Sequence, residues 1–102
     1  MGVVHYSNMK AELLIDERYV LDADSFVEIV AWRLPNPPRG SAHRIKYRLA
    51  YVVRGECVLR YDNEAGKGDH RHRANREELY AFTDVDQLLV DFWTDVESWS
   101  KR

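Results

Sequence analysis

The feature that most constrains the fold is an alternation of side-chain types over residues 43–53. The positions of one parity are mostly aromatic or apolar: His43, Ile45, Tyr47, Leu49, Tyr51 and Val53. The positions of the other parity begin with three cations: Arg44, Lys46 and Arg48, followed by Ala50 and Val52. Because successive side chains of a strand point to opposite faces, this pattern predicts a β-strand with one face in the core. Gly55 marks a turn, and residues 57–61 return as an apolar partner, so we expect an antiparallel hairpin at the centre of a sheet.

Three more strands and one helix are expected around this hairpin. Residues 10–16, continuing over 19–21, and residues 26–34 are rich in apolar and β-branched side chains, and residues 79–82 form a further short strand. A helix over 84–99, capped by Thr83, is indicated by apolar residues at helical spacing: Val85, Leu88, Leu89, Phe92, Val96 and Trp99. The sequence therefore predicts an α+β fold, a mainly antiparallel β-sheet of about five strands with a C-terminal α-helix packed on one face.

Length and composition fit one globular domain. The chain has 102 residues, of which 45% are hydrophobic and 31% charged, so we expect residues 1–102 to form a single domain. Residues 1–8 lack a clear period and are expected to be a flexible extension. The single cysteine, Cys57, excludes an internal disulfide, and no apolar run approaches the roughly 20 residues that span a membrane. Without a signal peptide either, the chain is expected to be cytoplasmic.

The net charge of −2 conceals a basic middle segment. Residues 33–76 carry eleven basic and four acidic side chains, whereas the segments on both sides are acidic. A basic segment in an otherwise acidic chain favours a localised anionic partner, although charges also serve to keep a surface soluble.

The polar stretch over residues 60–73 holds the side chains that most resemble a reaction site. His70 and His72 lie two positions apart, so in an extended chain they face the same side. One imidazole would act as general base on the 2′-hydroxyl of RNA and the other as general acid on the leaving 5′-oxygen, with Asp69 orienting them. Six cations are candidates for binding the phosphates of the RNA: Arg44, Lys46, Arg48, Lys67, Arg71 and Arg73. The competing interpretation is a solvated polar loop with no chemistry.

A metal site is the alternative chemistry for the same stretch. Asp62 and Glu64, together with the histidines, are residue types that bind divalent cations. The sequence thus leaves open an enzyme without cofactors and one that uses a divalent metal.

Several segments together resemble the TumE-type toxin family of bacterial toxin–antitoxin modules. They are MKAELL at 9–14, VEIVAW at 27–32, HRIKYRLAY at 43–51, LRYDNE at 59–64 and GKGDHRH at 66–72. The similarity covers about residues 9–99, so residues 9–102 would be the TumE-like domain. The resemblance implies a toxin of the bacterial cytoplasm with a cognate antitoxin, small and often bearing a helix-turn-helix.

Three functional hypotheses follow. The leading one is a toxin that acts as a small metal-independent endoribonuclease, with RNA as substrate and the antitoxin as partner. Association of two copies of the chain into a homodimer is a further expectation. The second is a metal-dependent nuclease or phosphotransferase, and the third is a non-catalytic regulatory or interaction protein.

Overall fold

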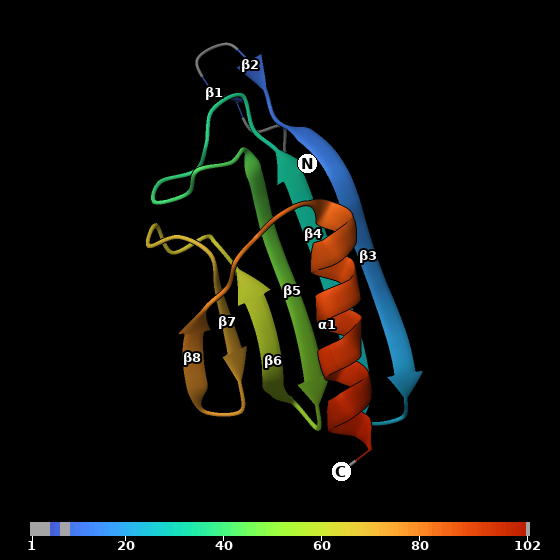
Figure 1. Cartoon of the computed structure of the whole chain (residues 1–102). Helices are drawn as coiled ribbons and strands as arrows, with labels where there is room; N and C mark the ends of the chain where they lie inside the picture. Colours follow the sequence, from blue (N-terminus) through green and yellow to red (C-terminus); the bar gives the residue numbers. More distant parts are fainter. Residues whose placement is uncertain (1–4, 7–8, 102) are drawn as a thin grey trace.

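A computed structural model of the chain describes residues 5–6 and 9–101 (Figure 1). Six strands form one antiparallel sheet in which the spatial order follows the sequence order: β3 (Glu12–Asp22), β4 (Ser25–Arg33), β5 (Ile45–Val53), β6 (Glu56–Asp62), β7 (His70–Arg73) and β8 (Arg76–Leu79). The predicted α+β class is confirmed. The hairpin β5–β6 is the middle pair of the sheet, as the alternation predicts.

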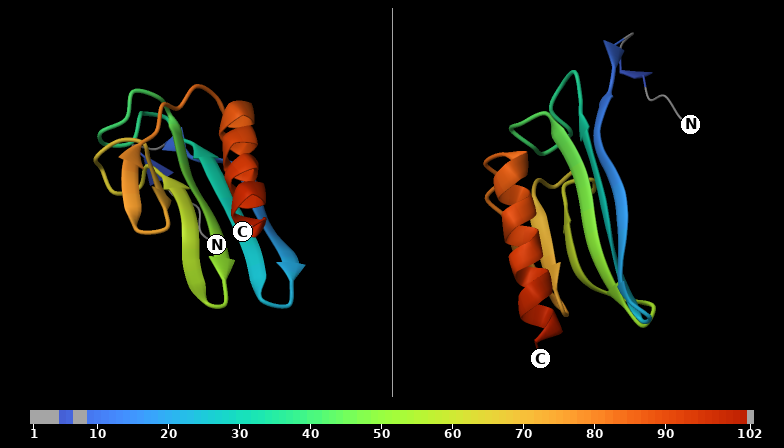
Figure 2. Two further views of the ribbon diagram at one scale, coloured as in Figure 1. Left: turned by 60° about the horizontal axis from the view of Figure 1, so that its bottom comes forward. Right: turned by 90° about the vertical axis from the view of Figure 1, so that its right-hand side faces the viewer.

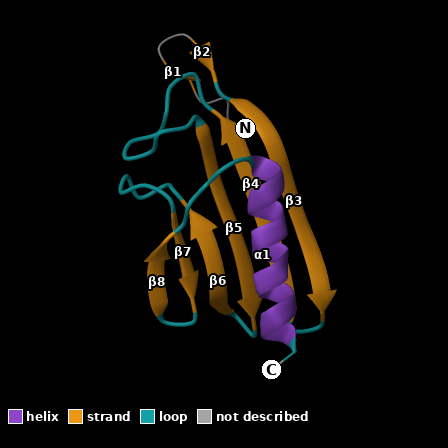
Figure 3. Ribbon diagram, viewed as in Figure 1, coloured by secondary structure: helices purple, strands orange, loops and turns teal. Residues whose placement is uncertain are grey.

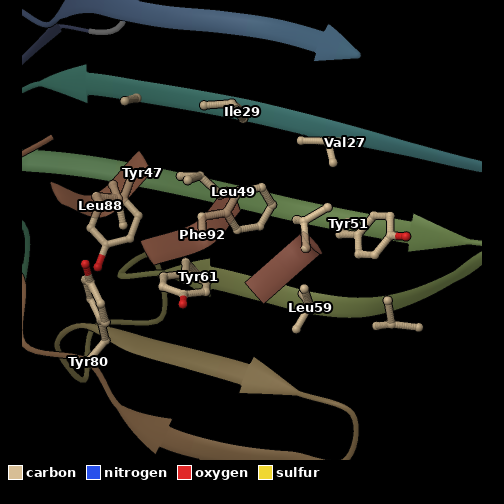
Figure 4. Packing of buried hydrophobic residues seen from close by; sticks show 13 residues of the cluster. Val27, Ile29, Tyr47, Leu49, Tyr51, Leu59, Tyr61, Tyr80, Leu88 and Phe92 are labelled. Atoms are coloured by element: carbon tan, nitrogen blue, oxygen red, sulfur yellow. The ribbon is translucent and has the colours of Figure 1, made fainter. Parts of the chain in front are cut away.

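The helix α1 (Val85–Ser100) packs along one face of this sheet (Figures 2 and 3). Alternate residues of the central strands and one stripe of the helix form the core between them (Figure 4): Val27, Ile29, Ala31, Tyr47, Leu49, Tyr51, Leu88, Phe92 and Val96. Because a strand alternates its faces, the remaining residues of β4 and β5 point to the face that α1 does not cover.

The main sheet has six strands where about five were predicted, and the difference lies in and after the polar stretch. Residues 70–73 and 76–79 are not loop but a hairpin at the edge of the sheet, and residues 80–82 form the connection to the helix instead of a strand. The turn between the two strands has Ala74 at φ 57, a conformation that the sequence pattern did not suggest. Both faces of this hairpin carry charged or polar residues, so it lacks the apolar alternation by which strands are recognised.

The start of the helix also differs from expectation. Its N-cap is Asp84 instead of Thr83, with the Asp84 carboxylate accepting from the backbone N–H of Gln87 at 2.8 Å. Two acidic residues of the helix, Asp91 and Asp95, are half-buried and accept hydrogen bonds from the Tyr80 and Tyr61 hydroxyls at 2.6 Å and 2.5 Å. They lie at the edge of the core because β6 and the segment after β8 run beneath them.

The N-terminal segment contributes a separate small element. Strands β1 (His5–Tyr6) and β2 (Met9–Lys10) pair with each other and not with the main sheet. Residues 1–4 and 7–8 lie outside the described residues, so a flexible, dispensable extension over residues 1–8 stays a prediction. Over the described ranges, no helix combines the length and apolar character needed to cross a membrane.

Candidate functional site

The candidate site lies on the face of the sheet opposite α1. A pocket of about 340 Å³ opens there, which we call the histidine pocket. It is lined by residues of β5, β6, β7, β8 and the β6–β7 loop: Arg48, Arg60, Asp62, Glu64, Ala65, Lys67, His70, His72 and Glu77. The strand register brings them together, because Asp62 is opposite both Arg48 and His70, and His72 is opposite both Arg60 and Glu77.

The β6–β7 loop is held against the loop before β5 by a close approach of glycines. Gly40, Gly66 and Gly68 all have positive φ, and a Cβ on Gly40 would lie 2.6 Å from the Gly66 carbonyl oxygen. Only a residue without a Cβ fits at Gly40. Buried Asn63 adds a second fixed point, since its side chain accepts from the Tyr47 backbone N–H at 3.0 Å and donates to the Ile45 carbonyl at 2.7 Å. The loop therefore has a defined path beside the pocket.

Asp69 ends this loop on the helix side of the sheet. Its carboxylate, 11% exposed, accepts from the Tyr47 hydroxyl and from Nε2 of His43, each at 2.7 Å. The Ser41 hydroxyl donates to the same carboxylate at 3.3 Å. These bonds give Asp69 the role of an anchor between the two loops.

The hydrogen bonds of the two pocket histidines define where each carries its proton. His70 Nδ1 lies 3.0 Å from the Gly68 carbonyl oxygen, which only accepts, so Nδ1 carries hydrogen. His70 thus keeps Nε2 as its basic nitrogen. His72 Nε2 lies 2.9 Å from an Arg60 nitrogen, which only donates, so in neutral His72 this Nε2 accepts and Nδ1 carries hydrogen.

Glu77 provides a second partner for His72. Its Oε2 lies 3.5 Å from His72 Nε2 and 3.2 Å from Lys67 Nζ. The hydrogen bond from Lys67 and the positive charge of that ammonium group lower the pKa of Glu77, so this carboxylate is charged at neutral pH. If His72 gains a proton at Nε2, this nitrogen can no longer accept from Arg60, and its N–H can donate to Glu77 instead. The pocket can therefore accommodate both protonation states of His72.

The cations of the pocket differ in their pairing. Arg60 Nε lies 2.7 Å from Asp62 Oδ2; the Nε–H is not aligned on this oxygen, so the contact is an ion pair without a well-formed hydrogen bond. Lys67 is paired with Glu77, whereas Arg48 forms no ion pair with any described residue. Arg48 is therefore the pocket cation most available to an anionic ligand.

A family model for the toxin TumE matches residues 10–100. The chain belongs to the toxin TumE family. No curated protein and no solved structure matches it. The family match confirms the resemblance seen in the sequence, and the name of the family supports a role as a toxin.

On this TumE-family chain, the histidine pocket unites six of the residues selected from the sequence: Arg48, Asp62, Glu64, Lys67, His70 and His72. His70 and His72 share one face of β7, as the two-residue spacing predicts. Five selected residues lie elsewhere. Lys46 is on the same face but lines a neighbouring pocket, and Arg44 is exposed before β5 begins.

The other two cations point to the opposite face. Arg71 and Arg73 alternate with the histidines along β7, and both pair with Glu78, at 2.8 Å in each case. Arg71 also donates to the Tyr61 hydroxyl at 3.2 Å. Arg71 and Arg73 therefore join a polar network under α1 and do not line the histidine pocket. Asp69 does not line this pocket either.

Two pocket residues were missed by reasoning from the sequence. Arg60 shares a face of β6 with Asp62, and this two-residue spacing was available as a signal. Glu77 carried no such signal, because its place opposite His72 depends on the β7–β8 hairpin. Among the described residues, no three His, Cys, Asp or Glu side chains are arranged to hold a metal ion, so Asp62 and Glu64 do not assemble such a group.

Proposed function

We propose that this TumE-family chain is a toxin that cleaves RNA as a metal-independent endoribonuclease. The observation that carries the proposal is that two histidines in different hydrogen-bonding states line one pocket beside an unpaired arginine. Such a set can remove one proton, deliver another and neutralise a phosphate.

The hydrogen bonds of the two histidines suggest which one is the general base and which one is the general acid. His70 has its Nδ1–H fixed on a carbonyl and a basic Nε2, which suits the general base that takes the proton of the 2′-hydroxyl. His72 has a Glu77 carboxylate oxygen 3.5 Å from Nε2 that can accept from this nitrogen when the ring carries both protons, which suits the general acid. The 2′-oxygen attacks phosphorus, the bond to the 5′-oxygen breaks, and His72 protonates that oxygen. The products are a 2′,3′-cyclic phosphate and a 5′-hydroxyl.

Electrostatic stabilisation comes from the cations of the pocket. Arg48 is free to bind a non-bridging phosphate oxygen, while Arg60 and Lys67 add positive charge that their carboxylate partners already hold in position. Preorganised charge of this kind is usually the largest contribution to lowering a transition-state barrier. Lys46 and Arg44 would guide the RNA outside the pocket.

The family membership supports a cognate antitoxin as partner, and we propose a small cytoplasmic protein that bears a helix-turn-helix. Masking the histidine pocket would be the simplest way for it to silence the toxin. A homodimer would be compatible with this arrangement.

Cleavage of a labelled single-stranded RNA tests the proposal. Replacing His70 or His72 by Ala should slow cleavage by about 10²- to 10⁴-fold, the contribution typical of a positioned acid or base. Arg48→Ala should weaken it, whereas Arg76→Ala, which removes an exposed arginine outside the pocket, should leave it unchanged. An all-deoxy strand should not be cut, because it lacks the attacking 2′-oxygen.

EDTA separates this proposal from the metal-dependent alternative. Cleavage that persists in EDTA, with a cyclic phosphate product, supports the histidine mechanism. Cleavage abolished by EDTA and restored by a divalent cation would contradict it. No cleavage of any RNA by the wild-type chain, with tight antitoxin binding, would favour a non-catalytic protein.

A further inference from the structure

Unpaired cations gather at one corner of the open face of the sheet. Arg60, Lys67, Arg71 and Arg73 each form an ion pair. In contrast, four cations just before and within the first half of β5 form none with any described residue: Arg39, Arg44, Lys46 and Arg48. Cations without internal partners keep their full charge available for an anionic ligand.

Two of these cations line a second pocket of about 210 Å³, which we call the Arg39–Lys46 pocket. Its lining is Leu34, Pro38, Arg39, Lys46, Asn63, Glu64 and Gly66. The stem of Arg39 lies along the β6–β7 loop, since its Cδ would be 3.5 Å from a Cβ on Gly66. This packing directs a flexible side chain along a fixed path.

The Arg39–Lys46 pocket adjoins the histidine pocket. Exposed Glu64 lines both. Lys46 and Arg48 are alternate residues on one face of β5, so their backbones are about 7 Å apart, close to the spacing of successive phosphates in an extended strand. An extended nucleic acid with one phosphate at Arg48 would therefore bring the next to Lys46.

Trp32 lies beside this phosphate path. It is directly opposite Lys46 in the β4–β5 ladder and alternates with Ala31, whose side chain is in the core, so its ring lies on the open face. Trp32 is half-exposed, and among the described residues it has no aromatic neighbour and no hydrogen-bond partner. Phe26, on the same face of β4, differs because the Arg18 guanidinium covers it at 3.9 Å. Trp32 therefore offers a partly exposed indole ring that, among the described residues, is engaged in no ring stack and no hydrogen bond.

We propose that the Arg39–Lys46 pocket binds the nucleotide next to the scissile phosphate in single-stranded RNA. Arg39 and Lys46 bind its phosphate, and Trp32 stacks on its base. The inference rests on the proposed function, because it extends the same RNA from the histidine pocket. It specifies the substrate class as single-stranded, since a base already paired and stacked in a duplex cannot lie on an indole ring.

Binding of a short 2′-O-methyl oligonucleotide by the full chain tests this proposal without cleavage, because the 2′-oxygen is blocked. Trp32→Leu keeps apolar bulk but removes the flat ring, and should weaken binding by about 5- to 150-fold, the range for one stacked base. Trp32→Phe should retain most of the affinity. Arg39→Ala and Lys46→Ala should each reduce the slope of log affinity against log salt by about 0.7, the value for one phosphate of a single strand. Arg76→Ala serves as the control, with no change expected.

The outcomes separate the two proposals. If RNA is cleaved in a His70-dependent manner but Trp32→Leu binds the oligonucleotide as well as the wild type, the second site is refuted and the endoribonuclease stands. If binding depends on Trp32 and Arg39 but no RNA is cleaved, the endoribonuclease is refuted and the binding site stands. Equal affinity for a duplex of the same sequence, or for polyglutamate of similar charge, would also overturn the proposal of a single-stranded RNA site.

Discussion

Replacing Asp69 by Ala should destabilise the fold more than it damages the chemistry. The Asp69 carboxylate is nearly buried and accepts hydrogen bonds from Tyr47, His43 and Ser41. The His43 ring accepts a hydrogen bond at Nδ1 from the Ile45 backbone N–H at 3.2 Å and stacks on Phe82 with centroids 3.8 Å apart. His43 is thus fixed from three sides, and its Nε2–H has no other acceptor than Asp69 among the described residues.

The magnitude follows from the groups that Asp69→Ala leaves without a partner. Tyr47 is 1% exposed, and an unsatisfied buried hydroxyl costs about 1–3 kcal/mol. The His43 side chain is 23% exposed, so water can partly replace its lost bond and the cost is about 1 kcal/mol. The longer bond from Ser41 adds little. We expect the free energy of unfolding to fall by about 2–4 kcal/mol in total.

Urea unfolding followed by tryptophan fluorescence measures this loss, and a double mutant isolates its cause. Tyr47→Phe removes the hydroxyl that Asp69→Ala would strand, so the double variant should be more stable than the sum of the single losses predicts, by about 1–2 kcal/mol. A loss below about 0.5 kcal/mol for Asp69→Ala would refute the anchoring role. If Asp69 instead orients a catalytic histidine, Asp69→Asn should remain stable yet lose cleavage by about 10²-fold or more.

Three other perturbations test the fold. Leu88→Ala should lower the free energy of unfolding by about 2–5 kcal/mol because Leu88 is fully buried, whereas Val90→Ala on the exposed side of α1 should change it by less than about 0.5 kcal/mol. The free energy of unfolding should fall as pH rises above about 10, because burial and the hydrogen bond to Asp69 raise the pKa of Tyr47. Above that pH the folded state keeps the phenol proton that the unfolded state loses, so Tyr47 contributes a loss of about 1.4 kcal/mol per pH unit. Tyr47→Phe should reduce that slope in alkaline urea titrations, and an unchanged slope would contradict the assignment. A chain that begins at Met9 should melt within a few degrees of the full chain by circular dichroism, since β1 pairs only with β2; a large drop would show that the N-terminal segment supports the sheet.

The sequence alone determined the elements whose pattern is local. The alternation over residues 43–53 arises because one face of this strand lies in the core. It predicted the central hairpin, and it predicted that Lys46 and Arg48 share the open face. The helix followed from a stripe of apolar residues, of which Leu88, Phe92 and Val96 are buried. The shared face of His70 and His72 needed only an extended backbone.

The tertiary structure decided what lies opposite each of these residues. The charged β7–β8 hairpin has no apolar face, so neither its existence nor its register could be predicted from periodicity. That register places Glu77 opposite His72 and directs Arg71 to Asp95 beneath the helix, away from the histidine pocket. The position of Asp69 on the helix side of the sheet likewise depends on tertiary structure. It follows the close approach of Gly40 to Gly66 and Gly68, which lie in two loops that meet only in the folded chain. Periodicity specifies which alternate residues of one strand share a face, but only the strand register determines which residues of the neighbouring strands join them on that face.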